Sequence, residues 1–202
     1  MVLPARSVTM VTTVEEFLRL PLPDVKAELV RGEVRVTPPP GAPHGVAGTN
    51  LLFFLLKHAE ATGSGRAFGG NFGYELVRFP HTVRVPDLSF VRAERLPSGG
   101  VGPGVLKIAP DLAVEVLSPS EAASMLEEKV DDYTLAGTPL IWVVDPVRRT
   151  VVVIAKDAPT QRLREGDTLD GGDVLPGFEC PVSEIFDGIA PQPTDSGGLE
   201  RA

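Results

Sequence analysis

Hydrophobic residues recur along the chain with two different periods, and these periods predict its helices and strands. Between His44 and Thr62, leucine and valine return at spacings of three and four residues, which predicts a helix that ends at Gly63. Between Ala27 and Thr37, two alternating runs flank Arg31-Gly32, which predicts a β-hairpin. The first half of the chain therefore combines a hairpin with a long amphipathic helix.

Other segments extend this pattern toward both ends of the chain. A short helix is expected over Thr13–Leu20, because Thr13 and Glu16 have the spacing of a capping box. A second helix is expected over Ser120–Ala136, with Ser120 as its N-cap and Gly137 as its stop. The expected strands are Arg66–Val77, Thr82–Arg92, Leu112–Leu117, Pro139–Asp145 and Arg149–Ala155, followed by a small closing element over Val174–Phe186.

The order of these elements predicts an α/β fold at the border with α+β, in which a mixed β-sheet is flanked by helices. The strand from Leu112, the helix from Ser120 and the strand from Pro139 suit a right-handed crossover between parallel strands. We expect one domain over residues 1–190. The proline- and glycine-rich segment 191–202 is predicted to be a disordered tail.

Composition and charge narrow the possible functions. The 202 residues are 43% hydrophobic and carry a net charge of −8, which argues against a tight non-specific DNA binder. An enzyme that meets DNA locally, through metal ions, is still compatible with this charge. The single cysteine excludes an internal disulfide framework and favours a cytoplasmic location. No membrane-spanning run and no signal peptide are predicted.

Two carboxylates fall in segments that otherwise resemble buried strands. Asp87 begins the first, PDLSFV, and Glu115 lies inside the second, PDLAVEVLSPS. An unpaired buried charge costs about several kcal/mol or more. If the strands are neighbours, both side chains can converge on one hard cation such as Mg²⁺, which prefers oxygen ligands. In the alternative, Asp87 caps a turn and Glu115 pairs with an arginine.

Lys129 is the next candidate, in the helical segment EEKVDDY. It borders the apolar stripe of Leu126, Val130 and Tyr133, so a helix packed on the Glu115 strand would bring it near the strand end. A lysine there can orient a water molecule or stabilise a phosphate in the transition state. In the alternative, it lies on a solvated helix face among acidic residues.

The other candidate site residues have weaker support from the sequence. His44 is either a third ligand or proton shuttle, or an ordinary residue after a proline turn. Cys180 has no visible base partner, which argues against a thiol nucleophile. The glycine-rich stretch Gly63–Gly73 lacks the Gly-Lys-Ser/Thr ending of a phosphate loop, so nucleotide binding is not expected there. Trp142, in an apolar strand, is expected in the core.

Several of these motifs together resemble a known family. VPDLSFV, DLAVEVLSPS, a helix with EK, and AGTPLIWVVDP are similar to the pattern of the Uma-two family of restriction endonucleases. The earlier AELVRGEVRVTPPPGAPHG is similar to that family's hairpin, proline turn and histidine. The resemblance covers Thr13 to Pro181. That family is in turn similar to the PD-(D/E)XK nuclease superfamily.

The resemblance implies a mixed-sheet nuclease core with a helix on each face, and Mg²⁺-dependent phosphodiester hydrolysis. It assigns Asp87 and Glu115 as metal-binding acids. The superfamily lysine would fall at Leu117, which cannot serve, and Lys129 is the match in the following helix. The residues that match with less certain roles are Glu28 and Glu33 of the hairpin and His44 at the start of the long helix. Met125 stands where the family usually has an aspartate.

The leading hypothesis is a DNA endonuclease that uses Mg²⁺ or Mn²⁺. Asp87, Glu115 and the Val116 carbonyl would hold the metal, and Lys129 would orient or activate the attacking water. Met125 and the acidic charge motivate a rival, a catalytically silent interaction module with the nuclease fold. A third hypothesis is a metal hydrolase for another phosphate ester. A homodimer is also expected, because the apolar segments around Trp142 and Val151–Ile154 exceed what one core needs.

Overall fold

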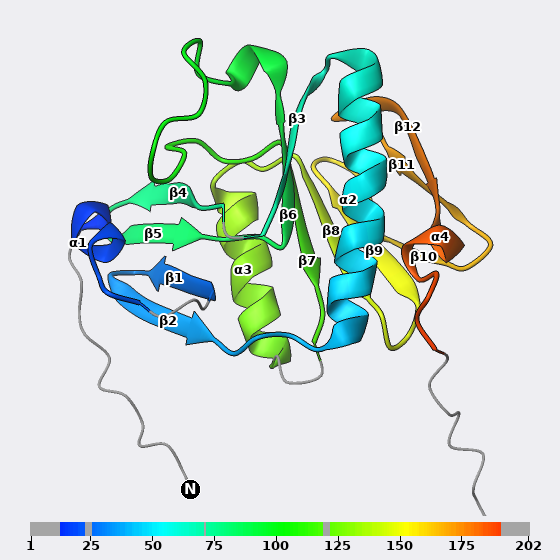
Figure 1. Cartoon of the computed structure of the whole chain (residues 1–202), viewed down its shortest axis with the longest axis horizontal. Helices are drawn as coiled ribbons and strands as arrows, with labels where there is room; N and C mark the ends of the chain where they lie inside the picture. Colours follow the sequence, from blue (N-terminus) through cyan, green and yellow to red (C-terminus); the bar gives the residue numbers. More distant parts are fainter. Residues whose placement is uncertain (1–12, 23–25, 71, 119–121, 191–202) are drawn as a thin grey trace, which may run out of the picture.

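The computed structural model describes residues 13–22, 26–70, 72–118 and 122–190 (Figure 1). The tail predicted over 191–202 lies outside these ranges. Along the chain the elements are α1 (Val14–Leu18), β1 (Lys26–Val30), β2 (Glu33–Thr37), α2 (Ala42–Thr62), β3 (Gly65–Gly69), β4 (Tyr74–Arg78), β5 (His81–Arg84), β6 (Leu88–Arg92), a 3₁₀ turn η1 (Ala93–Arg95), β7 (Leu112–Val116), α3 (Ala123–Leu135), β8 (Leu140–Asp145), β9 (Thr150–Ala155), β10 (Gln161–Arg164), β11 (Thr168–Gly171), β12 (Leu175–Pro181) and α4 (Val182–Ile185).

The large sheet has six strands in the order β10-β9-β8-β7-β6-β3. Strands β7 and β8 pair in parallel, with α3 as the crossover between them, and their other neighbours pair antiparallel. The predicted mixed sheet flanked by helices is therefore confirmed. Because β7 is central and buried along its whole length, any polar residue on it must find partners inside the protein.

Helices α2 and α3 cover opposite faces of this sheet. Val114 of β7 belongs to the core cluster that contains Leu51 of α2, whereas the neighbouring Ala113 packs with Tyr133 of α3. Successive strand residues point to opposite faces, so the two contacts place the helices on different sides. Figure 1 shows α2 lying along the strands, with α3 between the large sheet and a smaller one.

The smaller sheet has the order β2-β1-β5-β4. Its hairpin turns at Arg31 and Gly32, which have φ of 51° and 82°, so the predicted hairpin is confirmed. Helix α1 packs beside this sheet through Val14 and Phe17, and Thr13 forms the expected capping box with Glu16. This sheet forms the second wall of the cleft described below.

Two predicted strands are each divided between the two sheets. The stretch Arg66–Val77 contains β3 of the large sheet and β4 of the small one, and Thr82–Arg92 contains β5 of the small sheet and β6 of the large one. Pro86 has no N–H to donate to a ladder, and the second division falls at this residue. The expectation of two continuous strands was wrong, and Asp87 lies where the chain passes from one sheet to the other.

The start of α3 also differs from the sequence-based expectation. The helix begins at Ala123, and its N-cap is Ala122, which makes no side-chain capping bond. The predicted N-cap Ser120 lies outside the described residues. The predicted stop is confirmed, because Gly137 follows the helix with φ of 88°.

The C-terminal elements complete the core on the α2 side of the large sheet. Trp142 and Cys180 are fully buried in that cluster, as predicted for Trp142. Val151 is fully buried and Val153 and Ile154 pack against core clusters, so the apolar strands cited for a dimer are used within the chain. Within the described ranges, no helix has the length and apolar character needed to cross a bilayer.

Candidate active site

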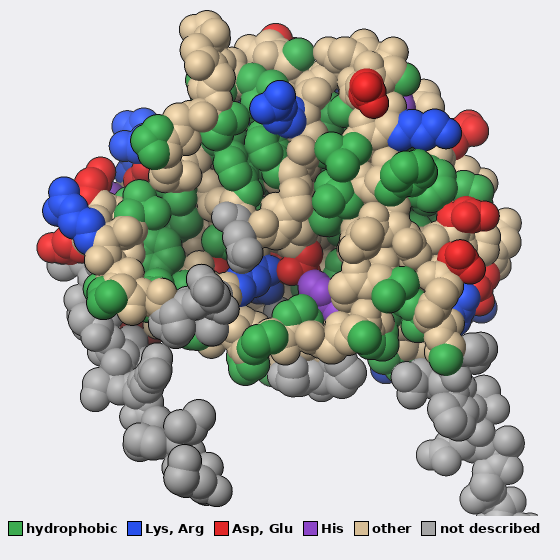
Figure 2. Space-filling model, in the orientation of Figure 1, with side chains coloured by type: hydrophobic (Ala, Val, Ile, Leu, Met, Phe, Trp, Pro, Cys, Tyr) green, Lys and Arg blue, Asp and Glu red, His purple; other side chains and the backbone are tan. Residues whose placement is uncertain are grey.

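A cleft of about 870 Å³ opens between the small sheet and the first turns of α2. Its walls come from β1, the proline turn after β2, α2, α3, and the ends of β6 and β7. The ionisable side chains on these walls are Lys26, His44, Asp87 and Lys129. Figure 2 shows acidic, basic and histidine side chains gathered in a hollow whose surroundings are mostly apolar or neutral. Charge is thus concentrated at one point of the cleft.

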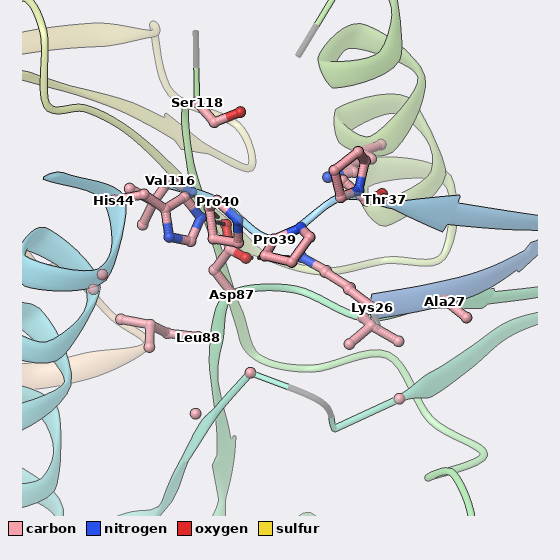
Figure 3. A pocket seen from close by; sticks show the side chains of 18 of the residues that line it. Lys26, Ala27, Thr37, Pro39, Pro40, His44, Asp87, Leu88, Val116 and Ser118 are labelled. Carbon is pink, nitrogen blue, oxygen red and sulfur yellow. Dashed lines mark hydrogen bonds and ion pairs between the residues drawn. The ribbon is translucent and has the colours of Figure 1, made fainter. Parts of the chain in front are cut away.

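Asp87 is the centre of this group. Its Oδ2 accepts a hydrogen bond from the Val116 backbone N–H at 2.8 Å and lies 3.1 Å from His44 Nε2. Its Oδ1 accepts a hydrogen bond from Lys26 Nζ at 2.8 Å. Figure 3 shows His44 and Lys26 approaching Asp87 from opposite sides. Burial alone would raise the pKa of Asp87, but the hydrogen bond from His44 and the charge of Lys26 hold it well below its usual range.

Glu115 is fully buried beside Asp87 on the neighbouring strand. Its Oε1 accepts a hydrogen bond from the Tyr133 hydroxyl at 2.8 Å, and its Oε2 accepts one from Lys129 Nζ at 3.0 Å. Burial raises the pKa of Glu115, and the charges of Lys26 and Lys129 oppose that rise. We expect the ionised form, because both oxygens accept hydrogen bonds from donors that favour a carboxylate.

Lys129 lies inside the protein. Only 4% of its surface is exposed, so the alternative of a solvated lysine is wrong. Asp132 and Tyr133, three and four residues further along α3, are the other buried residues of this helix, whereas Leu126 and Val130 are only partly buried. The predicted apolar stripe is therefore a largely polar one that points at Glu115 and the small sheet.

Lys26 is a site residue that the sequence analysis missed. Its Nζ lies 2.8 Å from Asp87 Oδ1 and 3.9 Å from Glu115 Oε2, so one ammonium group joins the two carboxylates. Burial alone would lower the pKa of Lys26, but Glu115 and Asp87 raise it above its ordinary value. The sequence of β1 did contain a hint of this role. Lys26 and Glu28 are two residues apart, so both side chains lie on the same face of a half-buried strand, and both are polar.

Glu28 lies next to this group without bonding to it. Its Oε1 accepts a hydrogen bond from the Val85 N–H at 2.8 Å, and its Oε2 accepts one from Arg84 Nη1 at 2.9 Å. Its charge contributes to the raised pKa of Glu115. The contacts of Glu28 thus anchor β1 to β5, whereas Glu33 is exposed at the start of β2 and does not join the group.

A buried ion network connects Glu28 to α3. Arg84 Nη2 donates to Asp132 Oδ2 at 2.6 Å and its Nε donates to the same oxygen at 2.8 Å. Arg31 and Arg35 of the hairpin both pair with Glu128 on α3. These bonds hold the small sheet against the helix that carries Lys129, and so they fix the width of the cleft on that side.

The oxygen atoms around Asp87 include the kinds of ligand that a divalent cation requires. Asp87 and Glu115 offer carboxylate oxygens and Val116 offers a backbone carbonyl, the hard donors that Mg²⁺ and Mn²⁺ bind. Within the described part of the chain, no group of three or more His, Cys, Asp and Glu side chains is arranged to hold a metal. The donor set therefore fits a cation that keeps water or phosphate oxygens as its other ligands, and Lys26 Nζ lies at these carboxylates in the structure.

Two further sequence candidates are located by the fold. Met125, where an aspartate was expected, is 37% exposed in the first turn of α3 and is not among the residues that line the cleft. Gly69, Gly70 and Gly73 of the glycine-rich stretch line the cleft. A Cβ at Gly73 would lie 2.7 Å from Val105 Cγ1, so the close packing of the wall leaves no room for a side chain there.

Comparisons with known proteins agree with this fold. The sequence model of the Uma2 family, described as "Putative restriction endonuclease", matches residues 14–183. The fold is similar to a solved "putative nuclease belonging to DUF820 from Anabaena variabilis ATCC 29413", with a TM-score of 0.75 and 22% identity. That match covers 86% of this chain and 97% of the other, and at this identity it speaks for the fold alone. A search among curated proteins found no match.

The family match spans most of the chain and includes every residue of the charged group in the cleft. It also includes the crossover β7-α3-β8, on which Glu115 and Lys129 lie. Family membership supports a nuclease function. The chain belongs to the Uma2 family of restriction-endonuclease-like proteins.

Proposed function

We propose that the protein is an endonuclease that hydrolyses DNA phosphodiester bonds with Mg²⁺ or Mn²⁺. The observation that carries the proposal is the convergence of Asp87 and Lys129, which line the cleft, with the fully buried Glu115. Two acids and a lysine from neighbouring strands and a following helix are the groups that metal-assisted phosphoryl chemistry needs. Family membership supports the same class of reaction.

Each side chain has a distinct task in this proposal. Asp87, Glu115 and the Val116 carbonyl would hold the metal, which would stabilise negative charge on the phosphate and help to ionise the attacking water. Lys129 would orient that water, since its ammonium group is fixed 3.0 Å from Glu115 by burial in α3. His44 would keep Asp87 in position through its contact with Oδ2.

The substrate must approach an acidic protein, so its contacts have to be local. The first turn of α2 offers one such contact, because His44 and Gly45 line the cleft near the N-terminus of a 21-residue helix. Unpaired backbone N–H groups and the helix dipole favour a phosphate at such an end. Lys26 on the opposite wall adds a positive charge. Both features favour a phosphodiester as the group that enters the cleft.

The deciding experiment is cleavage of plasmid and linear duplex DNA with Mg²⁺ or Mn²⁺, by the unaltered protein and by Asp87→Asn and Glu115→Gln. We expect cleavage that both substitutions abolish. Asp131→Asn serves as the matched control, because Asp131 is exposed on α3 and does not line the cleft. Single-stranded DNA, RNA and a phosphomonoester, tested in parallel, separate DNA cleavage from the hydrolysis of another phosphate ester.

The opposite outcome would favour the interaction module that Met125 and the net charge motivate. In that case the protein would neither bind Mn²⁺ in titration calorimetry nor cleave any of these substrates. Cleavage that survives in Asp87→Asn would also contradict the proposal, because it would locate the activity elsewhere or in a contaminant.

Three further expectations accompany the nuclease hypothesis. A homodimer would supply two active sites for the two strands of a duplex, and light scattering after gel filtration measures its mass. Domain organisation over residues 1–190 can be tested by limited proteolysis, which should remove only the ends. A cytoplasmic location agrees with the single cysteine, and fractionation of cells that produce the protein tests it.

A further inference from the structure

We infer that Lys26 occupies the cation position between Asp87 and Glu115, and that a divalent metal enters the site only by displacing its ammonium group. This inference rests on the proposed function, because it concerns the same two carboxylates. It adds to the metal site a residue, Lys26, to which neither the sequence motifs nor the family match assigns a role. Metal binding then becomes the exchange of one cation, the lysine ammonium group, for another.

The position of Lys26 is the first argument. Its Nζ lies 2.8 Å from Asp87 Oδ1 and 3.9 Å from Glu115 Oε2, so it faces one oxygen of each acid. The other Asp87 oxygen already accepts from Val116 N–H, and the other Glu115 oxygen accepts from Tyr133. Asp87 Oδ1 accepts from Lys26 Nζ, whereas Glu115 Oε2 faces Lys26 and also accepts from Lys129 Nζ at 3.0 Å. A metal would therefore replace Lys26 at Asp87 Oδ1 and share Glu115 Oε2 with Lys129.

The balance of charge is the second argument. Two carboxylates, Asp87 and Glu115, face two lysines, Lys26 and Lys129, within 3.9 Å. A divalent cation added to this group would leave an excess of positive charge in a largely buried site, where repulsion is strong. Moving one lysine into solvent halves that excess. Metal binding and the Lys26 contacts are thus mutually exclusive.

The third argument decides which lysine moves. The Lys26 side chain is 19% exposed and begins β1 at the wall of the cleft, whereas the Lys129 side chain is 6% exposed and lies within α3. Lys26 can swing toward the cleft by changing side-chain rotamers. Lys129 is packed inside and donates to the fully buried Glu115, so its departure would leave that acid without its closest cation.

Displacement also gives Lys26 a second contact. Once released, its ammonium group remains tethered to the cleft wall opposite His44 and the N-terminus of α2. An anionic phosphodiester in the cleft is the partner of the right charge for it there. Metal and substrate would then support each other, since the metal releases the lysine that contacts the substrate.

The test is Mn²⁺ titration calorimetry on the unaltered protein, Lys26→Met and Lys26→Arg, without DNA. We expect Lys26→Met to bind Mn²⁺ about tenfold more tightly or better, because no ion pair must be broken. Lys26→Arg keeps the competing charge and should bind about as weakly as the unaltered protein. Lys57→Met, an exposed lysine of α2 outside the cleft, is the matched control and should change nothing.

Thermal unfolding with and without Mn²⁺ provides a second measurement on the same variants. Lys26→Met should melt lower than the unaltered protein without metal, because its two carboxylates then repel, and should gain more from Mn²⁺. If the unaltered protein binds Mn²⁺ and Lys26→Met binds it no more tightly, the exchange is refuted while the metal site stands. If no variant binds Mn²⁺, the proposed function and the exchange both fail.

Discussion

His44 Nε2 lies 3.1 Å from Asp87 Oδ2, which joins the first turn of α2 to the segment that enters β6. Both side chains are largely buried at this contact, and Asp87 Oδ2 also accepts from the Val116 N–H. The histidine that follows the proline turn is therefore directed at the acid and away from solvent. Three segments that are distant in sequence meet at one carboxylate.

The contact predicts that His44 positions Asp87 and does not transfer a proton. His44→Ala should lower the rate of DNA cleavage by about tenfold, a barrier increase of about 1.4 kcal/mol. His44→Gln should recover much of this loss, because its amide can donate to Oδ2 in place of Nε2. Cleavage rates of the two variants at saturating Mg²⁺ provide the measurement. An equal loss in both would instead assign proton transfer to the imidazole.

Lys129→Met is expected to separate catalysis from metal binding. Cleavage should fall about 100-fold or more, a barrier increase of about 2.7 kcal/mol, because the water-orienting ammonium group is gone. Metal affinity should hold or rise, since a positive charge near the ion is removed. Because Lys129 is buried, stability should also fall by about 1.5–3 kcal/mol, the value of a hydrogen bond to a charged group.

Cleavage and Mn²⁺ affinity of Lys129→Met are best measured at a temperature where circular dichroism shows it folded. Lys156→Met is the matched control, because Lys156 is exposed and lies outside the cleft. Unchanged cleavage would remove Lys129 from the chemistry. Loss of metal binding together with cleavage would indicate that the lysine only maintains the local structure.

The buried network around Arg84 predicts a large and asymmetric effect on stability. Arg84→Met leaves Glu28 and Asp132 buried without their main cation, which should cost about 3–5 kcal/mol in the free energy of unfolding. Arg31→Ala removes a side chain that is 49% exposed, and it should cost less than about 1 kcal/mol. Urea unfolding of both variants compares them directly. Equal losses would contradict a buried network.

Cys180 should be inert to alkylation while the protein is folded. Burial raises the pKa of its thiol to about 12, with a smaller contribution from the charge of Glu184. At pH 8 only about one thiol in 10⁴ would then be ionised, and the thiolate is the reactive form. Mass spectrometry after iodoacetamide treatment should show labelling only when urea unfolds the chain. Rapid labelling of the native protein would contradict the burial of this side chain.

Local chemistry accounts for the elements that the sequence predicted well. Three of these features depend only on residues close together in the sequence, so each can be predicted without knowledge of the fold. They are the capping box of Thr13 and Glu16, the hairpin at Arg31-Gly32 and the hydrophobic period of α2. The parallel pair β7-β8 followed from two apolar runs separated by a helix. Of the charged group in the cleft, Asp87, Glu115, His44 and Lys129 were identified as candidates on residue type, position and family resemblance.

Contacts between segments distant in sequence decided the features that the sequence analysis missed. Lys26 lies 61 positions before the acid that it pairs with, and no local pattern links the two. Two predicted strands were divided because the chain passes from one sheet to the other within each of them. Pro86 marks the second of these passages, but the partner strands that hold each half are distant in sequence. From the sequence, Lys129 could also have been a residue of a solvated helix face, and its burial follows from the contacts of α3 with Glu115 and the small sheet. The sequence by itself determined which elements form and which acids lie on them, since those depend on local periodicity. Only the tertiary structure decided which cations neutralise those acids, because a buried charge is stabilised by partners that packing brings together.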